Sequence, residues 1–154
     1  MNKTSELKET AKINKVSREI IAHDFHVSMH GKLADKQIEA VKKTLLSTTN
    51  AYHATGSVVS MIFYLQFQVN IDNGKSFNGK AGGISSPGGG ALIGDVYTDD
   101  LERLYRDTVS FEFNCTPVYT SLIFFDSHSN CLGSYQSGSI STVAGVGGGS
   151  GKWS

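Results

Sequence analysis

Residues 108–126 read TVSFEFNCTPVYTSLIFFD, and two segments within this stretch decide the fold class. In Thr108–Asn114 apolar side chains alternate with polar ones, which is typical of an antiparallel strand with one buried face. In Pro117–Asp126 β-branched and aromatic residues occupy both sides of the alternation, and this composition also favours a strand. The stretch therefore predicts β-strands, and segments with strand-like composition and turn residues continue on both sides of it.

The N-terminal flank, Ser57–Asn70, predicts one bent strand or two strands joined by a kink. It leads into Asn73-Gly74, the preferred pair for a two-residue type I′ hairpin turn. Further strands are expected at residues 91–98, 130–136 and 139–146. Seven or eight short strands separated by turn residues indicate a closed barrel or a sandwich.

Glycine favours the barrel. All but one of the 17 glycines follow residue 55, and glycine inside a strand weakens it unless the strand bends or packs closely there. The glycines within strand-like segments are Gly82, Gly83, Gly94, Gly133 and Gly138. A small barrel needs such bends, and its closure removes exposed edges. We expect bulky side chains such as Phe111 to fill the interior.

One short helix interrupts the strands at residues 98–105. Asp99 and Glu102 have the spacing of a capping box, and both carboxylates would lie at the positive helix N-terminus. We expect Asp99 and Glu102 to be structural cap residues of a helix that covers one end of the barrel or a crossover connection.

The chain divides into residues 1–50, a helical or partly disordered N-terminal extension, and residues 51–154, the barrel domain. Residues 1–47 carry a formal charge of +3 and the remainder −3. Leu7, Ile13, Val16 and Ile20 lie roughly on one helical face. A second helix, which Asp35 could cap, would follow with Ile38, Val41 and Leu45 at helical spacing. The extension is expected to be solvated, to pack on a partner surface or to lie on a membrane.

Three segments carry a resemblance to a known family: residues 77–92 (FNGKAGGISSPGGGAL), residues 97–111 (YTDDLERLYRDTVSF) and the ending, with FFDS at 124–127 and STVAGVGGGSG at 141–151. The chain resembles the virulence-associated (Vap) proteins of rhodococci over most of residues 50–154. The resemblance implies a compact closed eight-stranded antiparallel β-barrel of Greek-key type with one short helix. It also implies a secreted effector of an intracellular pathogen that supports survival in macrophages by disturbing phagosome and lysosome maturation, with acidic lipid or a host protein as the partner.

Localisation and cysteine pairing stay open at this point. The family implies a secreted or cell-surface protein, whereas the first 30 residues hold no apolar run of signal-peptide length, so a cytoplasmic location is the alternative. Cys115 and Cys131 allow a single disulfide or two free thiols. We expect a monomer.

The sequence contains few residues that could form a catalytic or metal-binding site. His23, His26 and His30 could share a helix face and hold a metal, although surface histidines are the simpler interpretation. Asp126 and His128 lack the strained serine motif of a hydrolase and indicate a polar turn. Residues 145–151 have no phosphate-loop ending and are expected to be a terminal strand or tail. We expect no catalytic residues, no metal and no cofactor.

The sequence leaves two hypotheses for the function. A net charge of zero gives no general attraction to nucleic acid. The leading expectation is a non-enzymatic protein whose surface contacts a host membrane or protein. Trp153 with Lys152 could contribute to that contact, or Trp153 could close the barrel end. The alternative is a small-molecule carrier barrel with an open interior, as in lipocalins.

Overall fold

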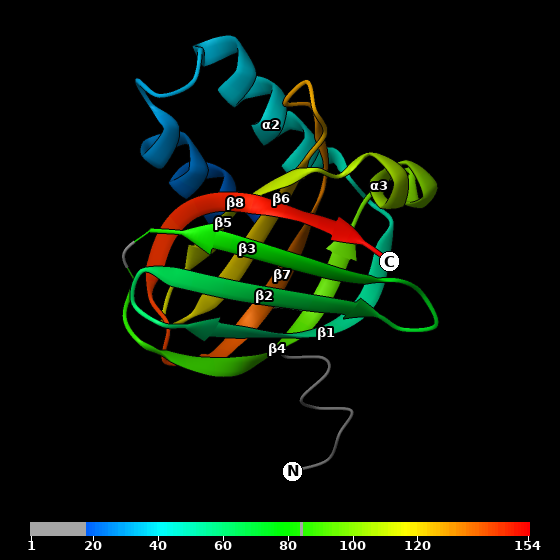
Figure 1. The fold of residues 1–154 in the computed structure, drawn as a ribbon. Helices are drawn as coiled ribbons and strands as arrows, with labels where there is room; N and C mark the ends of the chain where they lie inside the picture. Colours follow the sequence, from blue (N-terminus) through cyan, green and yellow to red (C-terminus); the bar gives the residue numbers. More distant parts are fainter. Residues whose placement is uncertain (1–17, 84) are drawn as a thin grey trace.

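The computed structural model describes residues 18–83 and 85–154, and its centre is a closed eight-stranded antiparallel β-barrel (Figure 1). Strands follow one another around the barrel in the order β1-β2-β3-β8-β5-β6-β7-β4. Four pairs join strands that are not consecutive in sequence, as the expected Greek-key type of connection requires: β1 with β4, β3 with β8, β4 with β7 and β5 with β8. The strands are β1 (Ala51–Ser60), β2 (Tyr64–Ile71), β3 (Ser76–Gly82), β4 (Gly88–Tyr97), β5 (Ser110–Cys115), β6 (Tyr119–Phe125), β7 (Cys131–Ser141) and β8 (Gly145–Trp153).

The lumen of the barrel is filled by aromatic rings. Phe77 contacts the rings of Phe111 and Phe124 with centroids 5.4 and 4.9 Å apart, and Phe67 lies 5.5 Å from Phe111. Offset and edge-to-face ring contacts at these distances are the favourable ones. Each of these four rings is at most 1% exposed, so the expected packed interior is confirmed.

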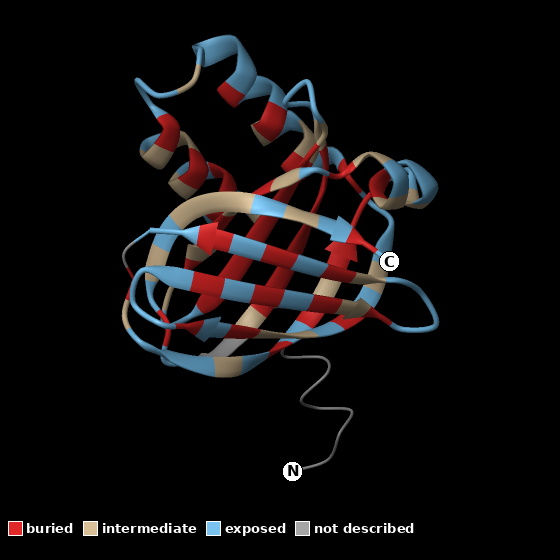
Figure 2. Cartoon of the chain, in the orientation of Figure 1, coloured by how far each residue is buried: buried red, intermediate tan, exposed pale blue. Residues whose placement is uncertain are grey.

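Alternation explains why these strands close on such a core. In β2 and β3 every second residue is buried and those between are exposed or half-buried (Figure 2), because successive side chains point to opposite faces of a strand. The sequence of β8 is mostly glycine, and a Cβ on Gly151 would lie 2.5 Å from the Phe77 ring. The glycine-rich ending is therefore the strand that closes the barrel over the aromatic rings.

Two of the five glycines expected to permit bends sit where a side chain would collide with backbone. A Cβ on Gly94 would lie 1.9 Å from the carbonyl oxygen of Gln136, and one on Gly133 would lie 2.4 Å from that of Tyr97. Gly133 also has a φ of +155° beside the irregularity in the β6–β7 pairing. By contrast, Gly82 and Gly138 face open space. The close-packing argument holds for Gly94 and Gly133 only.

The division of the last strands and the type of one turn differ from the prediction. Residues 139–146 are not a separate strand, because β7 continues to Ser141 and β8 begins at Gly145. At the β2–β3 connection the hairpin is present, but its turn is centred on Asp72 and Asn73, with the amide of Gly74 bonded to the Ile71 carbonyl at 3.0 Å. Asn73 has a φ of +57°, while Gly74 does not have positive φ, so the turn is not type I′.

The short helix α3 (Leu101–Asp107) covers one end of the barrel, as expected. Its N-cap is Asp100, whose carboxylate accepts a hydrogen bond from the Arg103 amide at 3.1 Å. The cap is therefore one residue later than the predicted Asp99, because the first helical residue is Leu101. Glu102 lies in the first turn, where its charge faces the helix dipole favourably.

Trp153 closes the same end. Its indole is 6% exposed and packs against Phe77, Phe124 and Tyr105 at 5.4 to 5.5 Å between centroids. Trp153 thus belongs to the core and does not present its ring to a membrane, whereas the neighbouring Lys152 is exposed. Reciprocal backbone hydrogen bonds of 2.9 Å between Ser76 and Ser154 fasten the chain end to β3.

A helical hairpin covers part of the outer wall. It consists of a helix over residues 18–29 and of α2 (Asp35–Ser47), joined by a tight turn (Figure 1). Ile38, Val41 and Leu45 of α2 are buried as expected, but the N-cap is Ala34 and not Asp35. The face predicted from Leu7, Ile13 and Val16 lies outside the described residues. The described helices of the hairpin are packed on the barrel, so the expectation of a solvated extension is wrong for them.

The hairpin has its own core, separate from the lumen. Its members come from both helices and from the outer face of β6. They are Ile21, Ala22, Phe25, Met29, Ile38, Val41, Leu45, Tyr119, Ile123 and Phe125. Every residue of β6 is consequently buried, one face by the lumen and the other by the helices. This double burial explains why its sequence has no polar side.

Candidate functional site

Four connections meet at the end of the barrel opposite to α3, and we call their described residues the loop end: residues 61–63, 83 with 85–87, 116–118 and 142–144. Hydrogen bonds join three of them. The Ser85 amide donates to the Ile62 carbonyl at 2.9 Å, and the Ala144 amide donates to the hydroxyl oxygen of Ser86 at 2.8 Å. The fourth, residues 116–118, lies at this end because Cys115 pairs with Gly145 where β8 begins. The loop end is therefore one surface built from four distant parts of the sequence.

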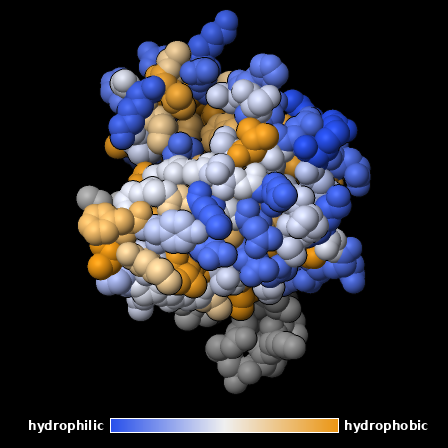
Figure 3. All heavy atoms as spheres, in the orientation of Figure 1, coloured by the Kyte–Doolittle hydropathy of each residue, from blue (hydrophilic) through white to orange (hydrophobic). Residues whose placement is uncertain are grey.

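The loop end exposes large apolar side chains. Met61 is 71% exposed, and Phe63 and Val118 are each 68% exposed, which makes them the most exposed large apolar residues that the structure describes. Val59, Ile62 and Tyr64 beside them are 40 to 47% exposed. In Figure 3 orange and tan side chains gather at the left edge of the barrel, where β2 begins and β3 ends. Contiguous exposed apolar groups of this kind mark interaction surfaces.

Charge is absent from this end. No Asp, Glu, Lys or Arg occurs in residues 54–71, 81–94, 113–125 or 129–151, the segments that form the loop end and the adjoining halves of the strands. Charged side chains gather at the opposite end, on and beside α3 and in the β2–β3 turn; among them are Asp72, Lys75, Glu102, Arg103, Arg106 and Asp107. The barrel is thus apolar at one end and charged at the other.

The turn that carries the exposed side chains is held in a fixed shape. Ile62 has a φ of +76°, an uncommon conformation for a β-branched residue. The Met61 amide bonds to the Tyr64 carbonyl at 2.8 Å, and the buried hydroxyls of Ser60 and Ser85 bond to each other at 2.6 Å. These contacts keep residues 61–63 projecting from the barrel and not folded back over it.

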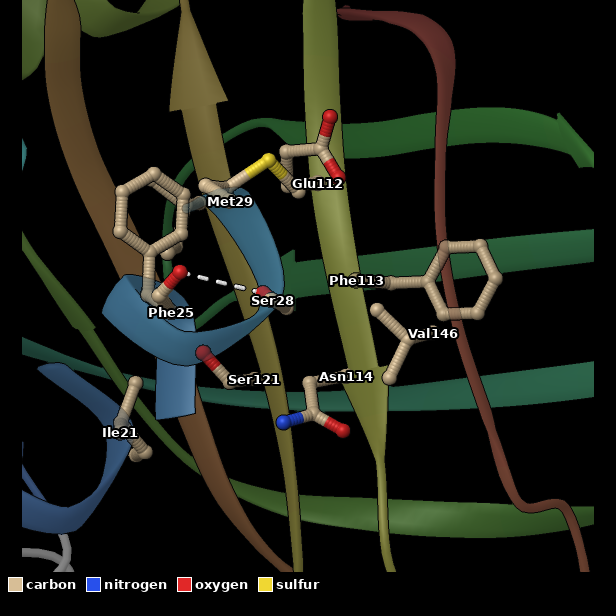
Figure 4. Close-up of a pocket in the computed structure, with 10 residues that line it drawn as sticks. Ile21, Phe25, Ser28, Met29, Glu112, Phe113, Asn114, Ser121 and Val146 are labelled. Carbon is tan, nitrogen blue, oxygen red and sulfur yellow. Dashed lines mark hydrogen bonds between the residues drawn. The ribbon is translucent and has the colours of Figure 1, made fainter. Parts of the chain in front are cut away.

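A second notable region is the seam between the helical hairpin and the sheet. Figure 4 shows Ile21, Phe25 and Met29 of the helix facing Glu112 and Ser121 of the sheet across a cavity of about 20 Å³, close to the size of one water molecule. This cavity is too small for an organic ligand.

Polar atoms in the seam are poorly satisfied. The Ser121 hydroxyl and both amide atoms of Gln136 are buried and have no hydrogen-bond partner within the described part of the chain. Such groups cost about 1–3 kcal/mol each when water is excluded. Tyr119 of β6 donates a hydrogen bond to the Asp24 carboxylate across the seam. Arg18 joins the two helices by donating to the carbonyls of Leu45 and Thr48, and its guanidinium lies over the Tyr97 ring of the barrel, 4.6 Å from the centroid.

Glu112 is the ionisable residue that lines the small cavity of the seam. Burial raises the pKa of its carboxyl from 4.5 to about 7, and Lys32, the charged neighbour acting on it, opposes this rise. Since the folded-state pKa is above the unfolded one, the folded protein binds more protons between pH 4.5 and 7. Stability is therefore highest below this window and falls as pH rises through it.

Replacing Glu112 by glutamine should remove this pH dependence. In the wild type we expect the free energy of unfolding to fall by about 1.5 kcal/mol between acidic and neutral pH, a value reduced for the partial exposure of the carboxyl. Urea denaturation at several pH values measures it. If the free energy of unfolding changed equally with pH in the wild type and in Glu112→Gln, the raised pKa of Glu112 would be contradicted.

The other predicted chemical groups do not converge on a site. His23 and His30 are exposed, and His26 lies 2.8 Å from the Lys42 ammonium. In the described residues no three His, Cys, Asp or Glu side chains gather as a metal-binding group. Asp126 accepts the amides of His128 and Asn130, each at 2.9 Å, as a polar turn does.

Both cysteines are free thiols on opposite faces of the barrel wall. Cys115 belongs to the lumen core, whereas Cys131 packs against the hairpin core. Burial raises the pKa of the Cys131 thiol to about 12. Cys131 also borders a groove of about 610 Å³ between α2 and residues 128–131.

None of the described helices is both long and apolar enough to cross a membrane.

Together these features define a class of protein: a small barrel with a filled lumen and an uncharged, apolar end available for contact. The family model described as Rhodococcus equi virulence-associated protein matches residues 8–154, and the chain belongs to this family. The chain is similar to the solved structure of VapD of Rhodococcus equi, with 41% identity, a TM-score of 0.66, and coverage of 68% of this chain and 97% of that one.

A second solved structure, VapB of Rhodococcus equi, is similar at 46% identity and a TM-score of 0.65, covering 68% of this chain and 96% of that one. The covered share of this chain equals the share that residues 51–154 make up. Those solved chains are therefore about as long as the barrel alone. A comparison with curated proteins returns no match.

Proposed function

We propose that this protein is a secreted, non-enzymatic effector that binds host membranes through its loop end, and that this contact disturbs phagosome and lysosome maturation and supports survival in macrophages. Membership of the virulence-associated family supports the effector role. The observation that carries the membrane contact is the loop end itself, where Met61, Phe63 and Val118 project from a surface without charged residues. Apolar side chains enter a bilayer readily when no charge has to be dehydrated with them.

This chemistry favours a lipid surface over the other candidates. A carrier function has no support, because the lumen is filled by Phe67, Phe77, Phe111 and Phe124. A nonspecific attraction to acidic lipid would need lysine or arginine at the contact, and the loop end has neither. Binding through the loop end should therefore depend little on headgroup charge or on salt.

The first test is co-sedimentation with phosphatidylcholine vesicles. Full burial of a large apolar side chain is worth about 1.5–3 kcal/mol. Changing Met61 and Phe63 together to serine should then weaken binding by about 100-fold, while binding of the wild type persists at high salt. The matched control is Val109→Ser, since Val109 is 46% exposed but lies at the α3 end; it should bind like the wild type. Failure of the wild type to bind vesicles of any composition would reject the proposal in favour of a host protein.

Secretion is tested separately. The protein should be found in the culture supernatant of the producing cell, and its restriction to the cytoplasmic fraction would support the alternative location.

A further inference from the structure

The polar side chains of the loop end are small, and most of them are hydrogen-bonded within the protein. Four of the described loop-end residues carry a hydroxyl group: Ser85, Ser86, Thr116 and Thr142. The Ser85 hydroxyl bonds to that of Ser60 at 2.6 Å, and Ser86 donates to the Thr142 carbonyl at 3.0 Å. Thr116 donates to the Tyr119 carbonyl, also at 3.0 Å. These hydroxyl groups are therefore engaged inside the protein and contribute little to binding a polar headgroup.

The attraction of the loop end to lipid must come from its apolar side chains. Its segments hold no charged residue, and three of its four described hydroxyl groups are engaged as above. Met61, Phe63 and Val118 are 68 to 71% exposed. Such side chains are stabilised by the acyl chains beneath the headgroups and not by the headgroups themselves. Binding should therefore depend on how easily the acyl chains can be reached.

The two turns that carry these side chains are held rigid by backbone hydrogen bonds. The Phe63 amide donates to the Met61 carbonyl at 3.0 Å, and the Thr116 amide donates to the Tyr119 carbonyl at 2.8 Å. Fixed turns cannot spread their side chains flat over a closed headgroup layer, so the headgroups must move apart to admit them. This separation is costly in a tightly packed bilayer and easy where acyl chains are already exposed.

The apolar side chains project at two places around the barrel. The β1–β2 turn carries Met61 and Phe63, and the β5–β6 turn carries Val118; these two strand pairs are opposite each other in the closed strand order. The exposed and half-buried residues of the other two described connections are small or are prolines: Gly83, Ser86, Pro87, Thr142 and Ala144. Each projection needs a gap of its own, so a bilayer with many gaps between headgroups suits this end of the barrel.

We infer that the loop end selects loosely packed lipid: it binds strongly curved bilayers, and bilayers that contain conical lipids, in preference to flat and tightly packed ones, through acyl chains exposed between the headgroups. This inference rests on the proposed membrane function and names the kind of membrane that the same surface selects. Membrane-binding surfaces that combine bulky apolar side chains with few charges are sensitive to curvature, because no headgroup attraction holds them on a flat bilayer.

Flotation of the full chain with dioleoylphosphatidylcholine vesicles of two sizes tests the inference. At equal outer-leaflet lipid concentration, vesicles about 30 nm across should bind the protein about tenfold more strongly than vesicles about 200 nm across. Adding diacylglycerol, an uncharged conical lipid, to the large vesicles should raise their binding toward that of the small ones. Salt should change neither result, because no charge takes part in the contact.

Serine variants show whether the loop end is responsible. Phe63→Ser and Val118→Ser should each weaken binding to the small vesicles about tenfold, to about the level of the large ones. Both positions are 68% exposed, so these variants should fold. Phe63→Leu retains an apolar side chain and should keep the size preference. The matched control, Val109→Ser at the α3 end, should keep it as well.

The outcomes separate the inference from the proposed function. Equal binding of the wild type to small and large vesicles would overturn the inference and leave the proposed function standing. A size preference that Phe63→Ser and Val118→Ser leave unchanged would also overturn it, since the selection would then reside elsewhere on the protein. If the wild type binds no vesicle of either size or composition, the proposed function and the inference both fail.

Discussion

Replacing Phe111 by alanine should destabilise the protein by about 4 kcal/mol. Phe111 is 1% exposed and lies between the rings of Phe67 and Phe77, at 5.5 and 5.4 Å between centroids. Removing the ring leaves a cavity that the closed wall cannot collapse to fill, because the strands are hydrogen-bonded around the whole barrel. Chemical denaturation, with the slope against denaturant checked for constancy, measures the loss.

The control for this prediction is Phe63→Ala at the loop end. Phe63 is 68% exposed, so the loss of its ring should change the free energy of unfolding by less than about 0.5 kcal/mol. An unchanged unfolding curve for Phe111→Ala would mean that the lumen is not packed, and the carrier alternative would then return.

The second large effect is expected at Gly94. A Cβ at this position would lie 1.9 Å from the Gln136 carbonyl oxygen and 2.7 Å from the Ser137 Cα, both backbone atoms of β7. Valine there would force β4 away from β7 along part of their pairing, and overpacking of this kind costs about 3 kcal/mol or more. Thermal unfolding of Gly94→Val against wild type gives the comparison.

Gly94→Ala is the milder variant if valine prevents folding, and it should still lower the melting temperature. The matched control is Gly82→Ala, because a Cβ on Gly82 has no atom within 4 Å. Equal stability of the Gly94→Ala and Gly82→Ala variants would show that the two strands do not approach each other so closely.

Much of the barrel could be predicted from the sequence because alternation and turn residues are local signals. Thr108–Asn114 alternates, and β5 has buried residues at every second position. The turn type at Asn73 could not be predicted, because the next strand begins at Ser76 and so sets a loop longer than two residues. Helix α3 was predicted, but its cap was misplaced by one residue because Asp99 and Asp100 offer the same carboxylate.

The cover over β6 was harder to predict. Both faces of Pro117–Asp126 are apolar, which is typical of a strand covered on both sides. The covering helix has its buried residues at Ile21, Phe25 and Met29, a stripe that histidines interrupt, while Ile20 of the predicted stripe is 49% exposed. Pairing of helix and strand across about 100 residues is a tertiary contact, and no local pattern encodes it.

The loop end was also missed, although a signal existed. The four long uncharged segments predict strands and turns when each is considered separately, and only the topology brings their ends together. For Trp153 the sequence allows a membrane contact or closure of the barrel end, and its 6% exposure in the structure confirms the closure. A search for stretches free of charge would have pointed to Met61 and Phe63 first.

The uneven distribution of charge between the two ends of the barrel also determines how the molecule would be oriented at a lipid surface. A molecule with one apolar end and one charged end orients at an apolar–water interface with its charged end in water. For this barrel, α3 and Ser154 would lie on the aqueous side. In the proposed membrane-bound state, a fluorescent protein or an epitope attached after Ser154 would therefore remain in solution. A label attached after Ser154 would therefore allow vesicle binding to be followed without disturbing the proposed contact of the loop end with lipid.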